Sequence, residues 1–142
     1  MTSISTAARN AAGAAITNLI DVGSAAPNGY IEVRTGTKPA NPATAATGTL
    51  LAVFNMSNPA FGTWINGTSL ANPISADTDI DANGVAGWFR VYSRDGVAIY
   101  DGTITATGGG GDAEFDNVNF LEHGTAQMSS LSLTMPQDAC AT

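Results

Sequence analysis

Aromatic and β-branched residues alternate with other residues on both sides of the short sequence Arg94-Asp95-Gly96. Asp-Gly is typical of a hairpin turn, because glycine readily takes the positive φ angle that such a turn needs. In the first run, 87–93, the alternation places Phe89 and Val91 on the face opposite Trp88, Arg90 and Tyr92. The pattern predicts an antiparallel hairpin over 87–104 at the centre of a β-sheet.

Residues 1–22 have the spacing of a helix instead. Ser3 or Ser5 can cap its first turn, and an alanine-rich stretch follows. Its apolar residues recur at helical spacing on one face: Ile4, Ala8, Ala12, Ala15, Ile16, Leu19 and Ile20. The stripe is thin and has Gly13 in its middle, so the helix is marginal alone and we predict that it docks on a partner.

The rest of the chain has strand patterns separated by turn signals. The predicted strands are 30–35, 49–56, 63–66, 68–72, 114–120 and 125–135. Asn66-Gly67 predicts a tight turn between two of them, and the proline-containing segment 36–48 predicts a long extended loop. Four consecutive glycines, 108–111, predict either a flexible hairpin tip or a site of close packing.

With the central hairpin, these stretches make about seven or eight short strands after one helix. This order predicts a mainly β fold, an antiparallel β-sandwich or barrel with an N-terminal helix. We expect a helical arm and loop over 1–28, a β domain over 29–136 and a loose C-terminal tail over 137–142.

The composition limits the classes of partner that this domain can bind. Only 12% of the 142 residues are charged, about half the usual share, and the net charge is −7 with five basic residues. So few basic residues argue against direct binding of nucleic acid. A weakly charged surface suits a chain that packs against copies of itself or a partner. We see no export signal and no apolar stretch long enough for a membrane, and therefore expect synthesis in the cytoplasm.

An acidic segment is the best candidate for ion binding. Asp77, Asp79 and Asp81 alternate, and Asp79-x-Asp81-x-Asn83-Gly84 matches the first half of a calcium-binding loop. The twelfth position of such a loop supplies a bidentate carboxylate, but Arg90 stands there. A strand pattern also follows where a helix is required. A solvated acidic loop is therefore the competing interpretation.

Enzyme chemistry finds little support. His123 is the only histidine and Cys140 the only cysteine, so neither a catalytic triad nor a zinc site has enough partners, and no internal disulfide can form. The glycine run lacks the lysine and the following helix of a phosphate loop. We predict no catalytic, cofactor-binding or metal-ligating residue.

Aromatic residues offer a different chemistry. Trp64, Trp88, Tyr92 and Tyr100 have the residue types of a platform on which sugars stack, and the last three share one face of the predicted hairpin if the alternation holds. Such residues also belong to cores and to subunit contacts, which is the interpretation that we favour.

Six phrases spread over nearly the whole chain carry a resemblance: Ala8-Arg9-Asn10, Tyr30-Ile31-Glu32-Val33-Arg34-Thr35-Gly36-Thr37-Lys38-Pro39-Ala40, 44–52, Asn58-Pro59-Ala60-Phe61-Gly62, Gly87-Trp88-Phe89-Arg90-Val91 and Asp101-Gly102-Thr103. In this order they resemble a family of small virion proteins of tailed bacteriophages, typically seen among the head genes. The likeness lies in order and wording rather than in a catalytic motif.

The resemblance implies a non-enzymatic structural protein of the virion. We expect a capsid cement, or decoration, protein that binds the major capsid protein on the capsid exterior and staples neighbouring capsomers. Attachment around three-fold junctions favours a homotrimer. The candidate partner-contact residues are Ile4, Ile16, Leu19, Ile20, Lys38, Pro39, Trp64, Trp88 and Tyr92.

Two alternatives remain at this stage. A tail-tube, tail-terminator or head–tail joining subunit is also small, β-rich and acidic. A carbohydrate-binding or adhesion module would use the aromatic residues. We also hypothesise that deletion of 1–22 abolishes attachment to shells while the β body stays folded.

Overall fold

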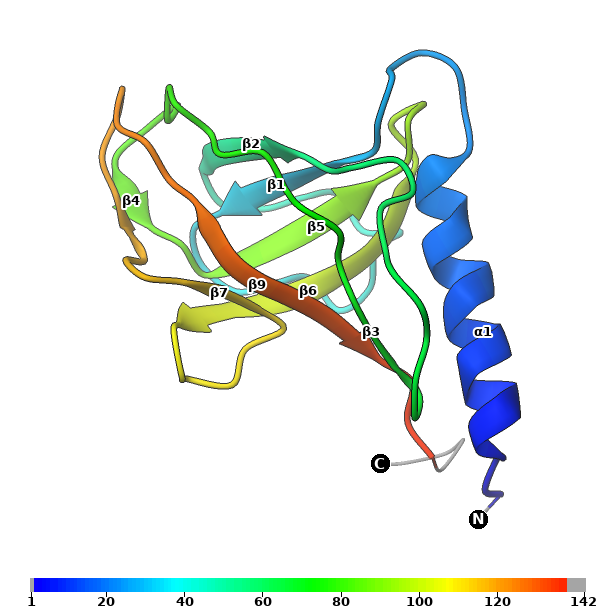
Figure 1. Ribbon diagram of the computed structural model, residues 1–142. Helices are drawn as coiled ribbons and strands as arrows, with labels where there is room; N and C mark the ends of the chain where they lie inside the picture. The colour runs from blue at the N-terminus through cyan, green and yellow to red at the C-terminus, as the bar shows by residue number, and fades with distance from the viewer. Residues whose placement is uncertain (1, 138–142) are drawn as a thin grey trace.

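The computed structural model describes residues 2–137 and shows a mainly β chain that starts with one helix. Its elements are α1 (Thr6–Asn18), the 3₁₀ turn η1 (Leu19–Asp21), β1 (Tyr30–Arg34), β2 (Leu50–Asn55), β3 (Thr68–Leu70), β4 (Gly84–Val85), β5 (Trp88–Tyr92), β6 (Ala98–Ala106), β7 (Ala113–Phe115), β8 (Asn119–Phe120) and β9 (Met128–Thr134). Seven strands form one sheet in the order β2-β1-β5-β6-β7-β9-β3, and β4 pairs with β8. Figure 1 shows α1 at one end of the molecule and β4 at the other. The predicted mainly β fold class with an N-terminal helix is confirmed.

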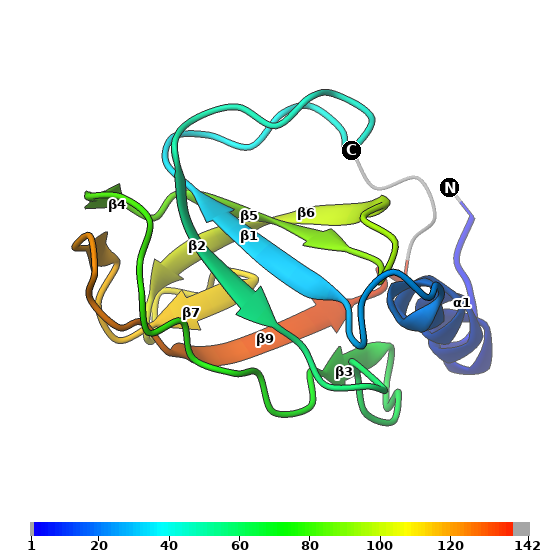
Figure 2. The same cartoon turned by 90° about the horizontal axis from the view of Figure 1, so that it is seen from above.

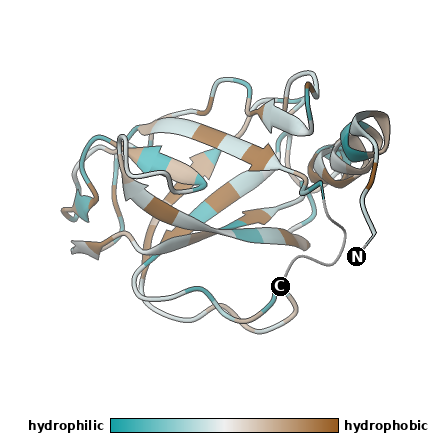
Figure 3. Cartoon of the chain, turned by 90° about the horizontal axis from the view of Figure 1, so that it is seen from below, coloured by the Kyte–Doolittle hydropathy of each residue, from teal (hydrophilic) through white to brown (hydrophobic). Residues whose placement is uncertain are grey.

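The predicted central hairpin is β5 and β6. Phe89 pairs with Gly102 and Val91 with Tyr100, and the turn closes where the N–H of Gly96 donates to the carbonyl of Ser93. Hydrophobic and polar residues alternate along the strands (Figure 3), as the pattern predicts. Strand β5 nevertheless is buried on both faces, because the core covers one and the loop 36–48 covers the other.

The glycine run Gly108–Gly111 connects β6 to β7, and these two strands are parallel. Parallel neighbours usually need a crossover of a dozen or more residues. Here Gly108 and Gly110 have φ angles of 86° and 83°, which side chains rarely adopt, and a Cβ on Gly109 would lie 2.7 Å from the side chain of Thr105. The run combines a tight turn with close packing, so the sheet is mixed rather than antiparallel throughout.

An irregular segment, 75–81, lies between edge strand β2 and the chain that precedes β9. On one side, the N–H groups of Ser75 and Asp81 donate to backbone carbonyls of β2, at 3.0 and 2.8 Å. On the other side, Asp77 and Ala126 exchange two backbone hydrogen bonds, at 3.0 and 2.8 Å. This segment therefore bridges the two ends of the curled sheet in Figure 2. Among residues 2–137, no strand pairing closes the sheet into a barrel.

Inside the curl lies a core with an aromatic centre. The rings of Phe54 on β2 and Phe115 on β7 are 5.4 Å apart, and those of Phe115 and Phe120 are 5.2 Å apart. Phe54 comes from a strand about sixty residues earlier in the chain than the other two, which lie on consecutive strands. Burial of such large apolar side chains is the main force that holds the curl together.

Helix α1 begins with the cap that the sequence predicts, since the hydroxyl of Ser5 accepts the N–H of Ala8 at 3.1 Å. Its middle turn carries Gly13, where a Cβ would lie 2.4 Å from ring atoms of Trp64. Glycine thus lets the indole lie directly on the helix. The indole Nε1 also donates to the hydroxyl of Thr17 at 3.3 Å.

Two polar contacts hold the helix on the body as well. The side chain of Asn10 accepts the N–H of Gly67 at 2.8 Å, and Nε of Arg9 donates to the carbonyl of Met135 at 2.9 Å. The predicted arm is thus packed along the β body. This packing does not support the hypothesis that the body stays folded after deletion of 1–22.

The predicted strand 63–66 is less regular than expected, and the predicted tail 137–142 lies mostly outside the described residues. Asn66-Gly67 does form the tight turn, but the stretch 63–66 contributes one isolated bridge at Ile65 instead of a strand. Of the predicted tail, 137–142, only Gln137 is described, and its carbonyl accepts the N–H of Ile4 at 2.9 Å.

Candidate docking surface

Two of the nine candidate contact residues are buried inside the folded chain. Trp88 is 0% exposed, and so is Ile20. Trp88 lies under the loop 36–48, and Ile20 packs against Gly29. A side chain without exposed surface cannot contact a partner, so their assignment as contacts was wrong. The alternation of the sequence places Trp88 on the outer face of the sheet correctly but cannot show what covers that face.

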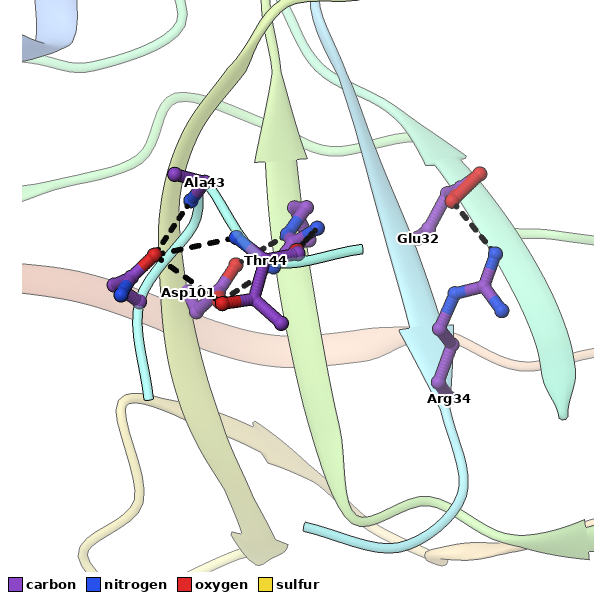
Figure 4. Close-up of polar contacts among 7 residues, drawn as sticks. Glu32, Arg34, Ala43, Thr44 and Asp101 are labelled. Carbon is purple, nitrogen blue, oxygen red and sulfur yellow. Dashed lines mark hydrogen bonds and ion pairs between the residues drawn. The ribbon is translucent and has the colours of Figure 1, made fainter. Parts of the chain in front are cut away.

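The cover of that face is polar and specific. Nε and Nη2 of Arg90 donate to the two carboxylate oxygens of Asp101, at 2.6 and 2.9 Å, and both side chains are almost fully buried. Nη1 of Arg90 donates to the carbonyl of Thr44 at 2.9 Å, which ties the loop to the sheet (Figure 4). The Arg90 guanidinium also lies 5.3 Å from the ring centre of Trp88.

The charge of this buried pair is stable. The hydrogen bond to Asp101 raises the pKa of Arg90 above its already high ordinary value, so the guanidinium stays charged. Every Arg90 donor group, Nε, Nη1 and Nη2, has an acceptor. A buried ion pair in which each of the three guanidinium nitrogens has an acceptor fixes the geometry of the loop on the sheet.

The loop 36–48 is folded on itself. The side chain of Asn41 accepts the N–H groups of Ala43 and Thr44, at 3.0 and 3.2 Å (Figure 4). Lys38 is exposed and Pro39 is half-buried. Because the loop covers the sheet, these two residues are presented from its outer surface rather than from an extended arm.

The remaining aromatic candidates do not gather into one strip. The ring of Tyr92 stacks on that of Tyr30 with 5.0 Å between ring centres and 14° between planes. Trp64 is half-buried on α1, and Ile4 is half-buried near the start of the chain. With Trp88 buried, the platform needed by a carbohydrate-binding module is not formed by these residues.

The acidic segment uses its side chains within the fold. The two carboxylate oxygens of Asp77 accept the N–H groups of Val53 and Asp79, both at 2.9 Å. Asp79 also contacts Nδ1 of His123 at 2.8 Å in a solvent-exposed ion pair, which raises the pKa of His123. In the described part of the chain, no three His, Cys, Asp or Glu side chains lie close enough to hold a metal ion.

An open apolar groove lies between the end of α1 and the β5–β6 hairpin. It has a volume of about 450 Å³. Its lining residues are Ile16, Leu19 and Val22 on the helix side and Ser93, Asp95, Val97, Ala98, Ile99 and Tyr100 on the hairpin side. Leu19, Val22 and Val97 are 50%, 59% and 60% exposed, although large apolar side chains are normally buried.

The groove unites two of the predicted contact residues, Ile16 and Leu19. Val22 and Val97 also line the groove and are not among the predicted contact residues. For Val97 the sequence does offer a signal, because an apolar residue directly after the Asp95-Gly96 turn stands at the tip of a hairpin. A hairpin tip cannot bury both of its faces, so such a residue is expected to be exposed.

Other exposed apolar residues lie away from the groove. Ile65 and Leu70 flank the Asn66-Gly67 turn, and Leu70 is 64% exposed. Val85 and Leu121 lie beside the β4–β8 pair at the opposite end of the molecule from α1 (Figure 1). Ile65 and Leu70 line a second open pocket of about 440 Å³. The groove differs from it in having two walls, one from the helix side and one from the hairpin, rather than in volume.

Comparison with known proteins adds no assignment: no family model, curated protein or solved structure matches the chain. Residues 2–137 also contain no helix of the length and apolar character that a membrane span requires.

Proposed function

We propose that the chain is a non-enzymatic structural protein of a tailed-phage particle, a cement protein that docks on the outer surface of the shell. The observation that carries the proposal is the open apolar groove between α1 and the β5–β6 hairpin. Exposed Leu19, Val22 and Val97 cost solvation free energy in the free monomer, and a docking partner would recover it.

Three features support a docking role over a catalytic one. The Arg90–Asp101 ion pair is almost fully buried, and each guanidinium nitrogen of Arg90 donates to an acceptor within the chain. Among the candidate ion-binding carboxylates, that of Asp77 accepts two backbone N–H groups. The resemblance in sequence order to small head proteins of phages names the kind of partner, a major capsid protein. Attachment around the three-fold junctions of a shell would favour a homotrimer.

A ring-forming tail or neck subunit is the second candidate. The observation that favours it is the presence of exposed apolar residues at both ends of the molecule, in the groove and at Val85 and Leu121. A ring needs two different surfaces on each subunit, because each copy contacts its neighbours through unlike faces.

The copy number of the chain in purified particles of the encoding phage separates the two candidates. Gel densitometry against the major capsid protein is expected to give a ratio near one to one for a cement protein. A ratio of a few per cent would identify a tail or neck subunit. Absence of the chain from the particles would overturn both proposals.

A further inference from the structure

One edge of β6 has no partner strand along its first half. Strand β6 runs from Ala98 to Ala106, but β7 pairs with it only from Ile104 onward. On the other side β5 pairs with β6 from Ala98 to Thr103. Within residues 2–137, Ala98–Gly102 therefore have strand pairing on one side only.

Hydrogen-bond directions identify the backbone groups that face this open edge. The N–H of Thr103 donates to the carboxylate of Asp112 at 3.0 Å, away from β5, whereas the N–H of Ile104 donates to the carbonyl of Gly87 at the start of β5. Directions alternate along a strand. Asp101 lies two residues before Thr103, so its N–H and C=O also point away from β5.

The open edge and the apolar groove adjoin each other. Ala98, Ile99 and Tyr100 belong to the edge and also line the groove, and Leu19 and Val22 form the facing wall. A strand edge beside a helix is a geometry in which proteins bind extended peptides, because the edge supplies main-chain hydrogen bonds and the groove takes alternate side chains. A globular surface could fill the groove but would leave the backbone groups of Asp101 without partners.

Charge defines the occupant further. Asp95 is the charged residue among those that line the groove. Its carboxylate accepts the N–H groups of Ser24 and Ala25, both at 2.8 Å, and these bonds lower its pKa and keep it ionised. A second copy of a chain with net charge −7 would meet this site with repulsion overall, whereas a segment with a basic residue would be attracted.

We propose that the groove binds an extended segment of the shell protein, which adds a strand to β6 at Asp101, inserts apolar side chains between Val97 and Leu19, and places a basic residue near Asp95. This inference rests on the proposed docking function and names the form of the partner. The segment adopts its extended shape on binding, so that its backbone and the edge of β6 satisfy each other.

Two matched variants test the groove. Val97→Asp places a charge in the groove, and Leu70→Asp places the same charge at an equally exposed position outside it. Cosedimentation of the full-length chain with purified shells that lack it measures occupancy. We expect Val97→Asp to weaken binding by about tenfold or more and Leu70→Asp by less than about twofold. Equal binding of the wild type and Val97→Asp would overturn the groove assignment alone, whereas a wild type that does not sediment would overturn the docking function and the groove together.

Strand addition has its own readout. Hydrogen exchange of the free and shell-bound protein, followed by mass spectrometry over 97–104, is expected to show new protection that includes the amide of Asp101. Unchanged exchange in a shell-bound sample would overturn strand addition. Light scattering supplies the last arm: a lower molecular mass for Val97→Asp than for the wild type in the absence of shells would identify a second copy as the occupant and overturn the proposal.

Discussion

The outer face of the β5–β6 hairpin and the groove at its edge differ in what covers them. On the outer face, Trp88 and Arg90 are sealed beneath the loop 36–48, and the buried charge has its counter-ion in Asp101. In the groove, Leu19 and Val97 stay exposed and no part of the described chain lies over them. Both regions have the residue types of a binding surface. The difference teaches that apolar and aromatic side chains form an open surface only where no other segment of the same chain packs over them.

Of the changes considered, loss of the buried counter-ion should lower the free energy of unfolding most. Asp101→Ala leaves the Arg90 guanidinium buried without its carboxylate, and we expect the free energy of unfolding to fall by about 3–5 kcal/mol. Urea unfolding measures it. Lys38→Ala, at an exposed position of the loop 36–48 that covers the ion pair, is the control and should change that free energy by less than about 0.5 kcal/mol. Similar small effects of both substitutions would show that the outer face is not sealed by the ion pair.

The wall of the groove depends on how α1 sits on Trp64. Gly13→Ala adds a methyl group where ring atoms of Trp64 would lie 2.4 Å away, so we expect a loss of about 1–3 kcal/mol of unfolding free energy despite the better helix propensity of alanine. In a Trp64→Leu background the same substitution should cost clearly less. A double-mutant cycle by thermal or urea unfolding measures this coupling, and additive effects would contradict direct contact between the two residues.

The open edge of β6 can be checked in the free protein. The amide of Asp101 points away from β5, whereas the amide of Gly102 lies opposite Phe89 in the ladder. We expect Asp101 to exchange its amide hydrogen at least about tenfold faster than Gly102, as NMR-detected exchange can resolve. Equal protection of the two amides would mean that the edge is already paired in the free chain.

The exposed pair His123–Asp79 should affect stability much less than the buried pair Arg90–Asp101. His123 and Asp79 are both largely exposed, and their contact raises the pKa of His123 above its ordinary value of 6.5. A raised pKa means that the folded state favours protonated His123. The resulting stabilisation is complete below the ordinary value and is lost as the pH rises through the folded value.

Asp79→Asn should return the pKa of His123 toward 6.5, which an NMR titration of the imidazole protons would follow. We expect little change in the pH dependence of unfolding, because solvent screens this pair. A His123 pKa that does not respond to the substitution would exclude the ion pair in solution.

The sequence alone determined the local features of this protein. The Asp-Gly hairpin, the strand over 30–35, the Asn66-Gly67 turn and the helix capped by Ser5 follow from alternation, helical spacing and turn chemistry, which act between neighbours in the chain. Two groove residues, Ile16 and Leu19, were also identified in this way, because the helical stripe marks them as apolar.

Only the tertiary structure decided which surfaces are covered. Trp88 and Tyr92 share a strand face with Arg90, but the loop that seals Trp88 and Arg90 is anchored by Thr44, forty-six residues before Arg90 in the chain. Gly13 is a weak point in a helix until Trp64 packs on it. The open edge of β6 exists because β7 begins opposite Ile104. These outcomes depend on contacts between segments far apart in the chain. The local pattern of apolar and polar residues does not specify which distant segment packs against a given surface.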